Sequence, residues 1–181
     1  MKRLFVFLLA LIPALAMATI MLPLSLEKLT NESDMVVLGN CTGKNVVDQG
    51  GKIYTEYTIQ VNETLKGAAL KEVKVRQLGG EINGRGLYVA GVAKFTPAEE
   101  VMVFLTKDSN GLRDVVGWAQ GKFHIYYDDQ TKKKYAMQQM EGLSLVKKGS
   151  GEIGEPSTSK VEVTVLKAQV KAIVTKKAAG K

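Results

Sequence analysis

The sequence predicts a mainly β fold, a small antiparallel barrel or sandwich with a short N-terminal helix and a C-terminal helix. Short apolar segments, several of them alternating with polar residues, follow one another at near-regular spacing. Turn sequences rich in Gly, Asp and Asn separate these segments. This combination is typical of antiparallel sheets and not of a parallel sheet.

The chain begins with the pattern of a secretory signal peptide. Lys2 and Arg3 precede an apolar run, and small residues stand at Ala18 and two positions earlier. We expect a signal peptide over residues 1–18 with Thr19 as the new N-terminus, although cleavage two residues earlier also fits the pattern. The run is too short for a spanning helix and no later run is apolar enough, so no transmembrane anchor is expected after cleavage.

Composition divides the mature chain into three parts. Residues 19–146 contain the leading helix and the predicted strands, and we expect them to form one β-barrel domain. Residues 147–160 are rich in Gly, Ser and charged residues and are expected to be a flexible linker. Residues 161–181 have apolar positions at both strand and helix spacing, but their alanines and lysines favour a basic C-terminal helix.

The elements of the barrel domain are predicted in chain order. Ser25 is the expected N-cap of the short helix, with Leu26 and Leu29 on its apolar face. The strands that follow share apolar alternation or a continuous apolar run: 35–38, 54–66, 73–77, 101–105, 123–127 and 135–137. Residues 101–105 are apolar throughout, so that strand is expected to be buried on both faces, and DDQT is the expected turn between the last two strands.

Charge and cysteine content restrict the classes of partner and site. The net charge is +7, and the positive excess lies after residue 130, where eleven lysines stand against four glutamates. Basic and aromatic residues are not interleaved, so no nucleic-acid partner is expected.

Cys41 is the single cysteine, which excludes an internal disulfide and a multi-cysteine zinc site. An exported chain without a cysteine pair is expected to be bacterial, periplasmic or extracellular, and Cys41 to be a small buried apolar residue.

The glycine-rich stretch VRQLGGEINGRGLYVAG, residues 75–91, contains no phosphate-binding motif. A dinucleotide fingerprint and a P-loop both need glycines at a spacing that is missing here, and strand formers follow where a helix should begin. We therefore expect the glycines to serve a strand bend and a connection. The partner-binding residues we predict are Gly79, Gly80, Glu81 and Arg85.

Catalytic, cofactor and metal sites are not predicted. His124 is the only histidine, and no cluster of Cys, His or acidic residues near it has the spacing of a metal site. Glu99 and Glu100 are adjacent, so on a strand they point to opposite faces and are unsuited to act together as acid and base. Asp128 and Asp129 are expected to form a turn.

Five segments resemble a family of exported bacterial proteins of unassigned function: SLEKLTNESDMVVLGN, YTEYTIQVNETLKG, VKVRQLGGE, FTPAEEVMVFL and VVGWAQGKF. The most specific pieces are LGGEINGRG and AQGKF. The first two segments are also similar, more distantly, to the opening strands of netrin-like domains, which include the tissue inhibitors of metalloproteinases. That resemblance implies a closed five-stranded OB-type barrel and secreted metalloproteases as partners. Those inhibitors place an N-terminal cysteine on the catalytic zinc, whereas here Thr19 is the expected first residue, without a predicted tether, and Cys41 lies in a strand.

Together these features predict a non-enzymatic exported binding protein that regulates or accompanies a secreted metalloprotease. Its expected partner is another exported protein. The alternative is a cell-envelope or matrix-associated structural protein that docks through its basic C-terminal segment on acidic polymer or lipid. A third hypothesis is an enzyme that uses His124 with Glu81 or Asp128.

Overall fold

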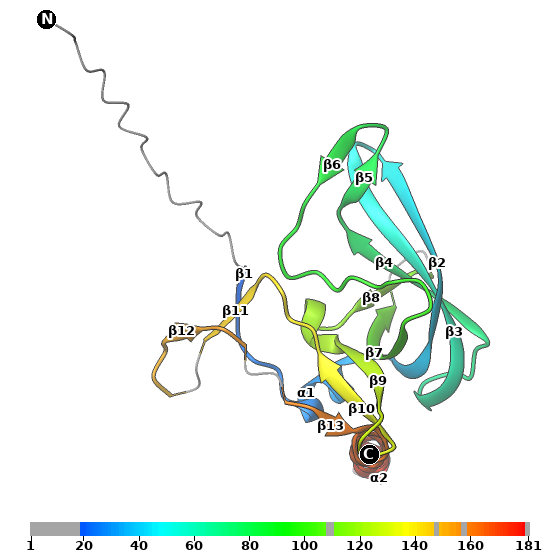
Figure 1. The fold of residues 1–181 in the computed structure, drawn as a ribbon, viewed down its shortest axis with the longest axis vertical. Coiled ribbons are helices and arrows are strands. Elements are labelled where there is room, and N and C mark those ends of the chain that lie inside the picture. Colours follow the sequence, from blue (N-terminus) through cyan, green and yellow to red (C-terminus); the bar gives the residue numbers. More distant parts are fainter. Residues whose placement is uncertain (1–18, 108–110, 147–148, 157–158, 180–181) are drawn as a thin grey trace, which may run out of the picture.

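The computed structural model describes residues 19–107, 111–146, 149–156 and 159–179. The fold is mainly β, with 51% of the described residues in strands and 18% in helices, and a helix lies at its C-terminal end (Figure 1). The predicted mainly β class with a C-terminal helix is thus confirmed. The predicted signal peptide, residues 1–18, lies outside the described residues. No helix within the described ranges is long and apolar enough to cross a membrane.

Eight strands form the main sheet, as neighbours in the order β13, β10, β9, β7, β2, β3, β4, β8. Their bounds are β2 Met35–Gln49, β3 Lys52–Lys66, β4 Glu72–Leu78, β7 Glu100–Lys107, β8 Arg113–Val115, β9 Lys122–Asp128, β10 Lys133–Gln138 and β13 Val161–Glu162. A further pairing joins β8 to β7, so the pairings run from β2 through β3, β4, β8 and β7 back to β2. Within this circuit only the pairing between β4 and β8 is parallel.

The remaining short elements lie beside the main sheet. They are β1 Thr19–Met21, β5 Gly80–Ile82, β6 Arg85–Leu87, the 3-10 helix η1 Trp118–Gly121, β11 Leu143–Val146 and β12 Ile153–Gly154. Strands β1, β11 and β12 pair in that order as a second sheet, and β5 pairs with β6 as a hairpin. Strand β12 falls within the stretch predicted as a linker, residues 147–160, where it pairs with the end of β11.

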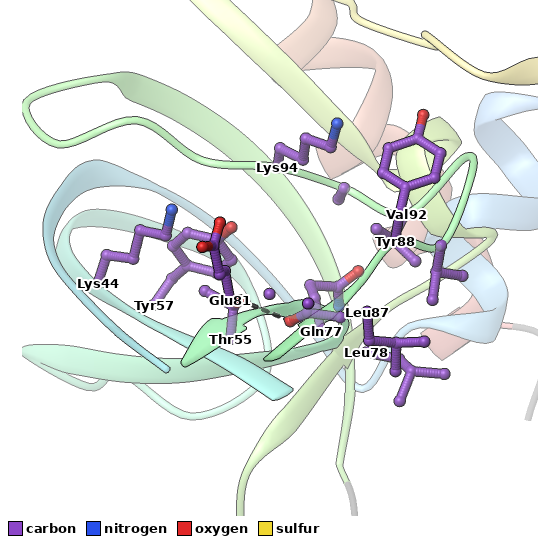
Figure 2. A pocket seen from close by; sticks show the side chains of 15 residues that line it. Lys44, Thr55, Tyr57, Gln77, Leu78, Glu81, Leu87, Tyr88, Val92 and Lys94 are labelled. Atoms are coloured by element: carbon purple, nitrogen blue, oxygen red, sulfur yellow. Dashed lines mark hydrogen bonds between the residues drawn. The ribbon is translucent and has the colours of Figure 1, made fainter. Parts of the chain in front are cut away.

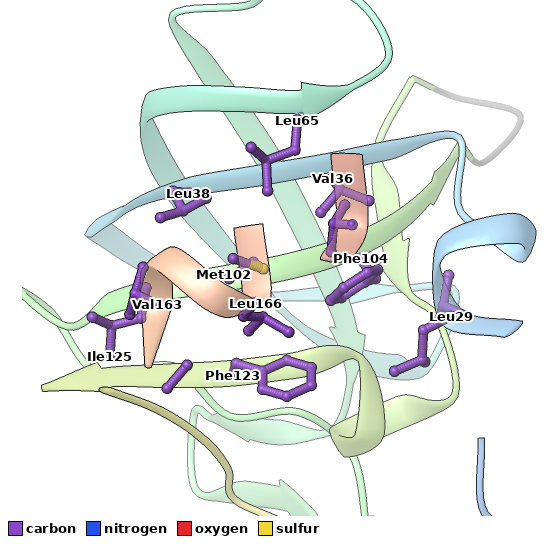
Figure 3. Close-up of a cluster of buried hydrophobic side chains, with 13 residues drawn as sticks. Leu29, Val36, Leu38, Leu65, Met102, Phe104, Phe123, Ile125, Val163 and Leu166 are labelled. Carbon is purple, nitrogen blue, oxygen red and sulfur yellow. The ribbon is translucent and has the colours of Figure 1, made fainter. Parts of the chain in front are cut away.

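The apolar core occupies both faces of the main sheet. Strand β7 shows this most clearly, because its side chains alternate between two buried clusters. Val101, Val103 and Leu105 belong to one cluster, and Met102 and Phe104 belong to the other, which is drawn in Figure 3. All five side chains are fully buried. The prediction that this strand is buried on both faces is therefore confirmed.

The two helices cover the cluster shown in Figure 3. Helix α1, Leu26–Glu32, begins at the predicted N-cap, where the Ser25 hydroxyl accepts a hydrogen bond from the Lys28 amide at 3.1 Å. Helix α2, Val163–Ala179, follows directly after β13. The helices contribute Leu29, Val163, Leu166 and Val170 to the cluster. The C-terminal segment showed apolar positions at both strand and helix spacing. In the structure its first two residues form β13, and the helix follows.

Candidate functional site

The glycine-rich stretch forms a tight hairpin at the end of the molecule away from α2 (Figure 1). Strands β5 and β6 are joined by Asn83 and Gly84, whose φ angles are 53° and 70°. Two consecutive positive φ angles in a two-residue loop are the signature of a type I′ turn, which Asn-Gly forms readily. The Asn-Gly pair was thus the sequence signal for a hairpin at this point, where we had expected only a bend.

Gly79 and Gly80 are required by close packing at the base of the hairpin. A Cβ atom on Gly79 would lie 2.8 Å from the Leu87 carbonyl oxygen, and one on Gly80 would lie 2.6 Å from the Thr55 hydroxyl. Both glycines also have positive φ angles, 105° and 141°. Thr55 on β3 donates a hydrogen bond to the Gly79 carbonyl at 2.7 Å. These two predicted site residues therefore anchor the hairpin to the main sheet.

The two charged residues of the predicted site differ in their surroundings. Arg85 forms an ion pair with Asp48 at 2.8 Å, which ties the hairpin to the end of β2. The Arg85 side chain is still 61% exposed. Glu81 is exposed and makes no ion pair with any described residue. The hairpin thus presents one paired and one unpaired charge to solvent.

A cavity of about 520 Å³ lies between the hairpin, the main sheet and the segment that follows β6 (Figure 2). Three of the four predicted residues line it, Gly79, Gly80 and Glu81, while Arg85 does not. Its other lining residues come from four segments: Lys44, Thr55, Tyr57, Gln77, Leu78, Gly86, Leu87, Tyr88, Val89, Val92, Ala93 and Lys94. Sequence reasoning missed these residues because only the folded chain brings β2, β3 and β4 together with the hairpin.

The neutral polar side chains that line this cavity are buried, whereas its lysines are exposed. Thr55, Tyr57 and Gln77 are at most 7% exposed. Burial raises the pKa of the Tyr57 hydroxyl, and hydrogen bonds with the Phe95 backbone and Thr55 oppose that shift. Lys44 and Lys94 are exposed. The cavity therefore combines a floor with neutral polar groups and a rim with positive charge.

A second group of polar residues lies behind the cavity wall. The buried Glu99 carboxylate accepts hydrogen bonds from Lys122 Nζ at 2.6 Å and from the Thr96 amide at 2.9 Å, and it lies 2.9 Å from His124 Nδ1. The Glu99 and Lys122 side chains are only 6% and 3% exposed. Burial lowers the pKa of Lys122, while its bond to Glu99 opposes the shift. This network holds the segment before β7 against β9.

The other residues considered for chemistry have structural partners. The carboxylate partner of His124 is Glu99 and not Glu81 or Asp128. Asp128 accepts hydrogen bonds from the amides of two residues that follow it, which confirms the predicted turn. Cys41 is fully buried, as predicted, and burial raises the pKa of its thiol. Within the described residues, no group of three or more His, Cys, Asp or Glu side chains is placed to hold a metal ion.

The predicted N-terminus of the mature chain is tethered, contrary to our expectation. The Thr19 backbone nitrogen donates to the Gly142 carbonyl at 3.0 Å, and its hydroxyl donates to the Ala90 carbonyl at 2.9 Å. Strand β1 also pairs in parallel with β11. This tether could not be predicted from the sequence, because it depends on a parallel pairing between segments far apart in the chain.

Comparison of the chain with protein-family models gave no match, and comparison with curated proteins gave none either.

Proposed function

We propose that the chain is an exported, non-enzymatic binding protein that recognises another exported protein through the β5–β6 hairpin. The observation that carries this proposal is a group of exposed apolar side chains at the hairpin. Leu78, Leu87 and Tyr88 are 38%, 37% and 74% exposed. Exposed apolar residues that gather at one place mark interaction sites, and tyrosine is enriched in protein interfaces.

We further propose that the five paired strands β2, β3, β4, β8 and β7 form an OB-like, netrin-like barrel. The support is the closed circuit of pairings, with its single parallel pair between β4 and β8. A closed barrel has no free strand edges, whereas the small hairpin beside it keeps the outer edge of β6 open. The proposed recognition surface therefore lies where the hairpin meets the barrel, with Leu78 at the end of β4 and Leu87 at the end of β6.

A secreted metalloprotease is the candidate partner, and the support for it is the resemblance of two segments to netrin-like domains. Thr19 is not a cysteine, and its backbone nitrogen is hydrogen-bonded to Gly142. The zinc-binding role of the N-terminal cysteine in those inhibitors therefore has no counterpart among these residues. In this proposal the partner is engaged through the hairpin instead.

The alternative, docking of the basic C-terminal segment on an acidic envelope polymer, has less support. Lys167 and Lys171 of α2 both pair with Glu63 of β3, so part of their charge is used within the molecule. Lys177 donates to the Asn31 carbonyl at 3.0 Å. The helix packs its apolar face on the sheet and is therefore part of the folded domain.

An affinity experiment tests the hairpin proposal. Tagged mature protein is incubated with the medium and periplasmic extract of the source bacterium, captured proteins are identified by mass spectrometry, and binding of each purified candidate is measured. A Leu87→Asp, Tyr88→Ser double variant is expected to lose binding. Tyr127→Ser is the control, because Tyr127 is 54% exposed on β9 and does not line the cavity. Equal binding by the double variant and the parent would contradict the proposal.

A further inference from the structure

The cavity beside the hairpin has the composition of a small-molecule site. Its volume of about 520 Å³ falls within the range of ligand pockets, roughly 300–1,000 Å³. Apolar side chains of Leu87, Val92 and Ala93 form part of its wall, beside polar side chains that include Thr55, Tyr57 and Gln77. Such sites combine apolar walls with a small number of polar groups that orient the ligand.

The floor supplies a hydrogen-bond acceptor from a buried side chain. Gln77 is 7% exposed, and its Nε2 donates to the Arg76 carbonyl at 2.6 Å. No described residue donates to its carboxamide oxygen. Gln77 lines the cavity, and its carboxamide oxygen keeps its capacity to accept a hydrogen bond.

The rim favours an anion. Lys44 and Lys94 both line the cavity, and neither forms an ion pair with a described residue. Lys94 Nζ instead lies 5.0 Å from the centre of the Tyr88 ring, which places a cation beside an aromatic wall. Glu81 is the single carboxylate in the cavity lining, so the two lysines leave a positive excess. Figure 2 shows the Lys44 and Lys94 side chains on separate segments, with Lys94 running toward Tyr88.

We propose that this cavity binds a small molecule with an apolar body and one anionic end, a carboxylate or a sulfonate. The apolar body contacts the wall, and the anionic end lies at the rim with Lys44 and Lys94. The cavity shares Leu78, Leu87 and Tyr88 with the surface proposed to recognise a protein, but small-molecule binding is measured on the isolated protein, without any partner. Each proposal can therefore fail alone.

Two fluorescent probes with the same ring system test the proposal. 8-Anilinonaphthalene-1-sulfonate carries an anionic group, and N-phenyl-1-naphthylamine lacks it. The mature protein is expected to bind one sulfonate probe per chain, several-fold more tightly than the neutral probe. In two-dimensional amide NMR spectra, the largest shifts are expected at Gly79, Gly80 and Gly86.

Variants distinguish the contribution of the two lysines to probe binding from the contribution of the shape of the cavity. Lys44→Gln with Lys94→Gln is expected to weaken the sulfonate probe by about three- to tenfold, the effect of losing two exposed ion contacts, and to leave the neutral probe unchanged. Lys74→Gln is the control, since Lys74 is an exposed lysine of β4 that does not line the cavity. Gly86→Val should weaken both probes, because Gly86 lines the cavity and a Cβ there meets no atom within 4 Å.

Three results would overturn the proposal. One is equal affinity of the parent for both probes, which would make the cavity an apolar surface without charge selectivity. Another is unchanged sulfonate binding in the double lysine variant. The third is a set of NMR shifts outside the cavity residues, and this result uses the parent protein alone, so it stands even if a variant does not fold.

Discussion

Replacement of Glu99 by Gln tests whether the buried ion pair stabilises the fold. Glu99 and Lys122 are 6% and 3% exposed and lie 2.6 Å apart. The substitution keeps the shape of the side chain but leaves the Lys122 ammonium buried without a counter-charge. Breaking a buried pair in this way costs about 3–5 kcal/mol. In a chain of this size, such a loss lowers the unfolding midpoint by roughly 6–20 °C.

Urea unfolding of the mature protein, followed by circular dichroism and by Trp118 fluorescence, measures the change. Glu100→Gln is the matched control, because its partner Lys134 is 52% exposed and such pairs contribute less than about 1 kcal/mol. Adding Lys122→Met to Glu99→Gln should recover most of the stability, since an apolar side chain replaces the isolated charge. The reasoning is refuted if Glu99→Gln costs no more than Glu100→Gln.

The pH dependence of the unfolding free energy gives a second test of Glu99→Gln. Burial holds the folded-state pKa of Lys122 below its ordinary value of 10.5, and Glu99 limits that shift. Without the Glu99 charge, the pKa should fall further. Between the folded and the ordinary pKa, the unfolded chain binds a proton that the folded chain does not, so stability rises with pH in that window. The deficit of Glu99→Gln is therefore expected to shrink as the pH rises toward 10.5, and a constant deficit would contradict this explanation.

Three further substitutions test local features, each by urea unfolding. Gly39→Ala should cost more than about 2 kcal/mol because its Cβ would overlap a backbone carbonyl of β3, whereas Gly43→Ala, with its nearest contacts at 3.4 Å, should cost less. Ser25→Ala should cost about 1 kcal/mol through loss of the helix cap, and Ser25→Asp should not. Burial raises the pKa of Glu63, but hydrogen bonds from two lysines of α2 lower it below 4.5 overall. Its stabilisation is present above pH 4.5 and lost as the pH falls through the folded pKa. Glu63→Gln should therefore cost about 0.5–1 kcal/mol of unfolding free energy at pH 7. The unfolding free energy of this variant should also depend less on pH below pH 4.5.

Local sequence patterns were sufficient for the elements that depend on local chemistry. The Ser25 cap, the alternation of Val73, Val75 and Gln77 on β4, and the two-sided burial of β7 follow from residue type and period alone. Each of these features depends on a few neighbouring residues in the sequence, and the structure confirms each one. The Asn83-Gly84 turn belongs to the same class, since its dipeptide specifies the turn type.

Features that depend on strand order were not predictable from the sequence. Glu99 meets His124 because β7 pairs with β9, with Val101 opposite His124. No spacing rule marks two residues 25 positions apart as hydrogen-bond partners. The same holds for the cavity, where Lys44 comes from β2 and Lys94 from the segment before β7. Such distant positions become neighbours through the pairing of strands and its register, and neither can be derived from this sequence alone.

The buried ion pair and the cavity are physically connected. Lys122 Nζ donates to the Lys94 carbonyl at 2.5 Å and lies 5.0 Å from the centre of the Phe95 ring. Phe95 in turn packs on Tyr57, with ring centroids 4.9 Å apart. The lysine that Glu99 holds in place therefore fixes the backbone at Lys94 and supports the aromatic pair at the cavity floor. Because this segment has no strand pairing of its own, the buried charges supply the rigidity that a ladder of strand hydrogen bonds provides elsewhere in the sheet.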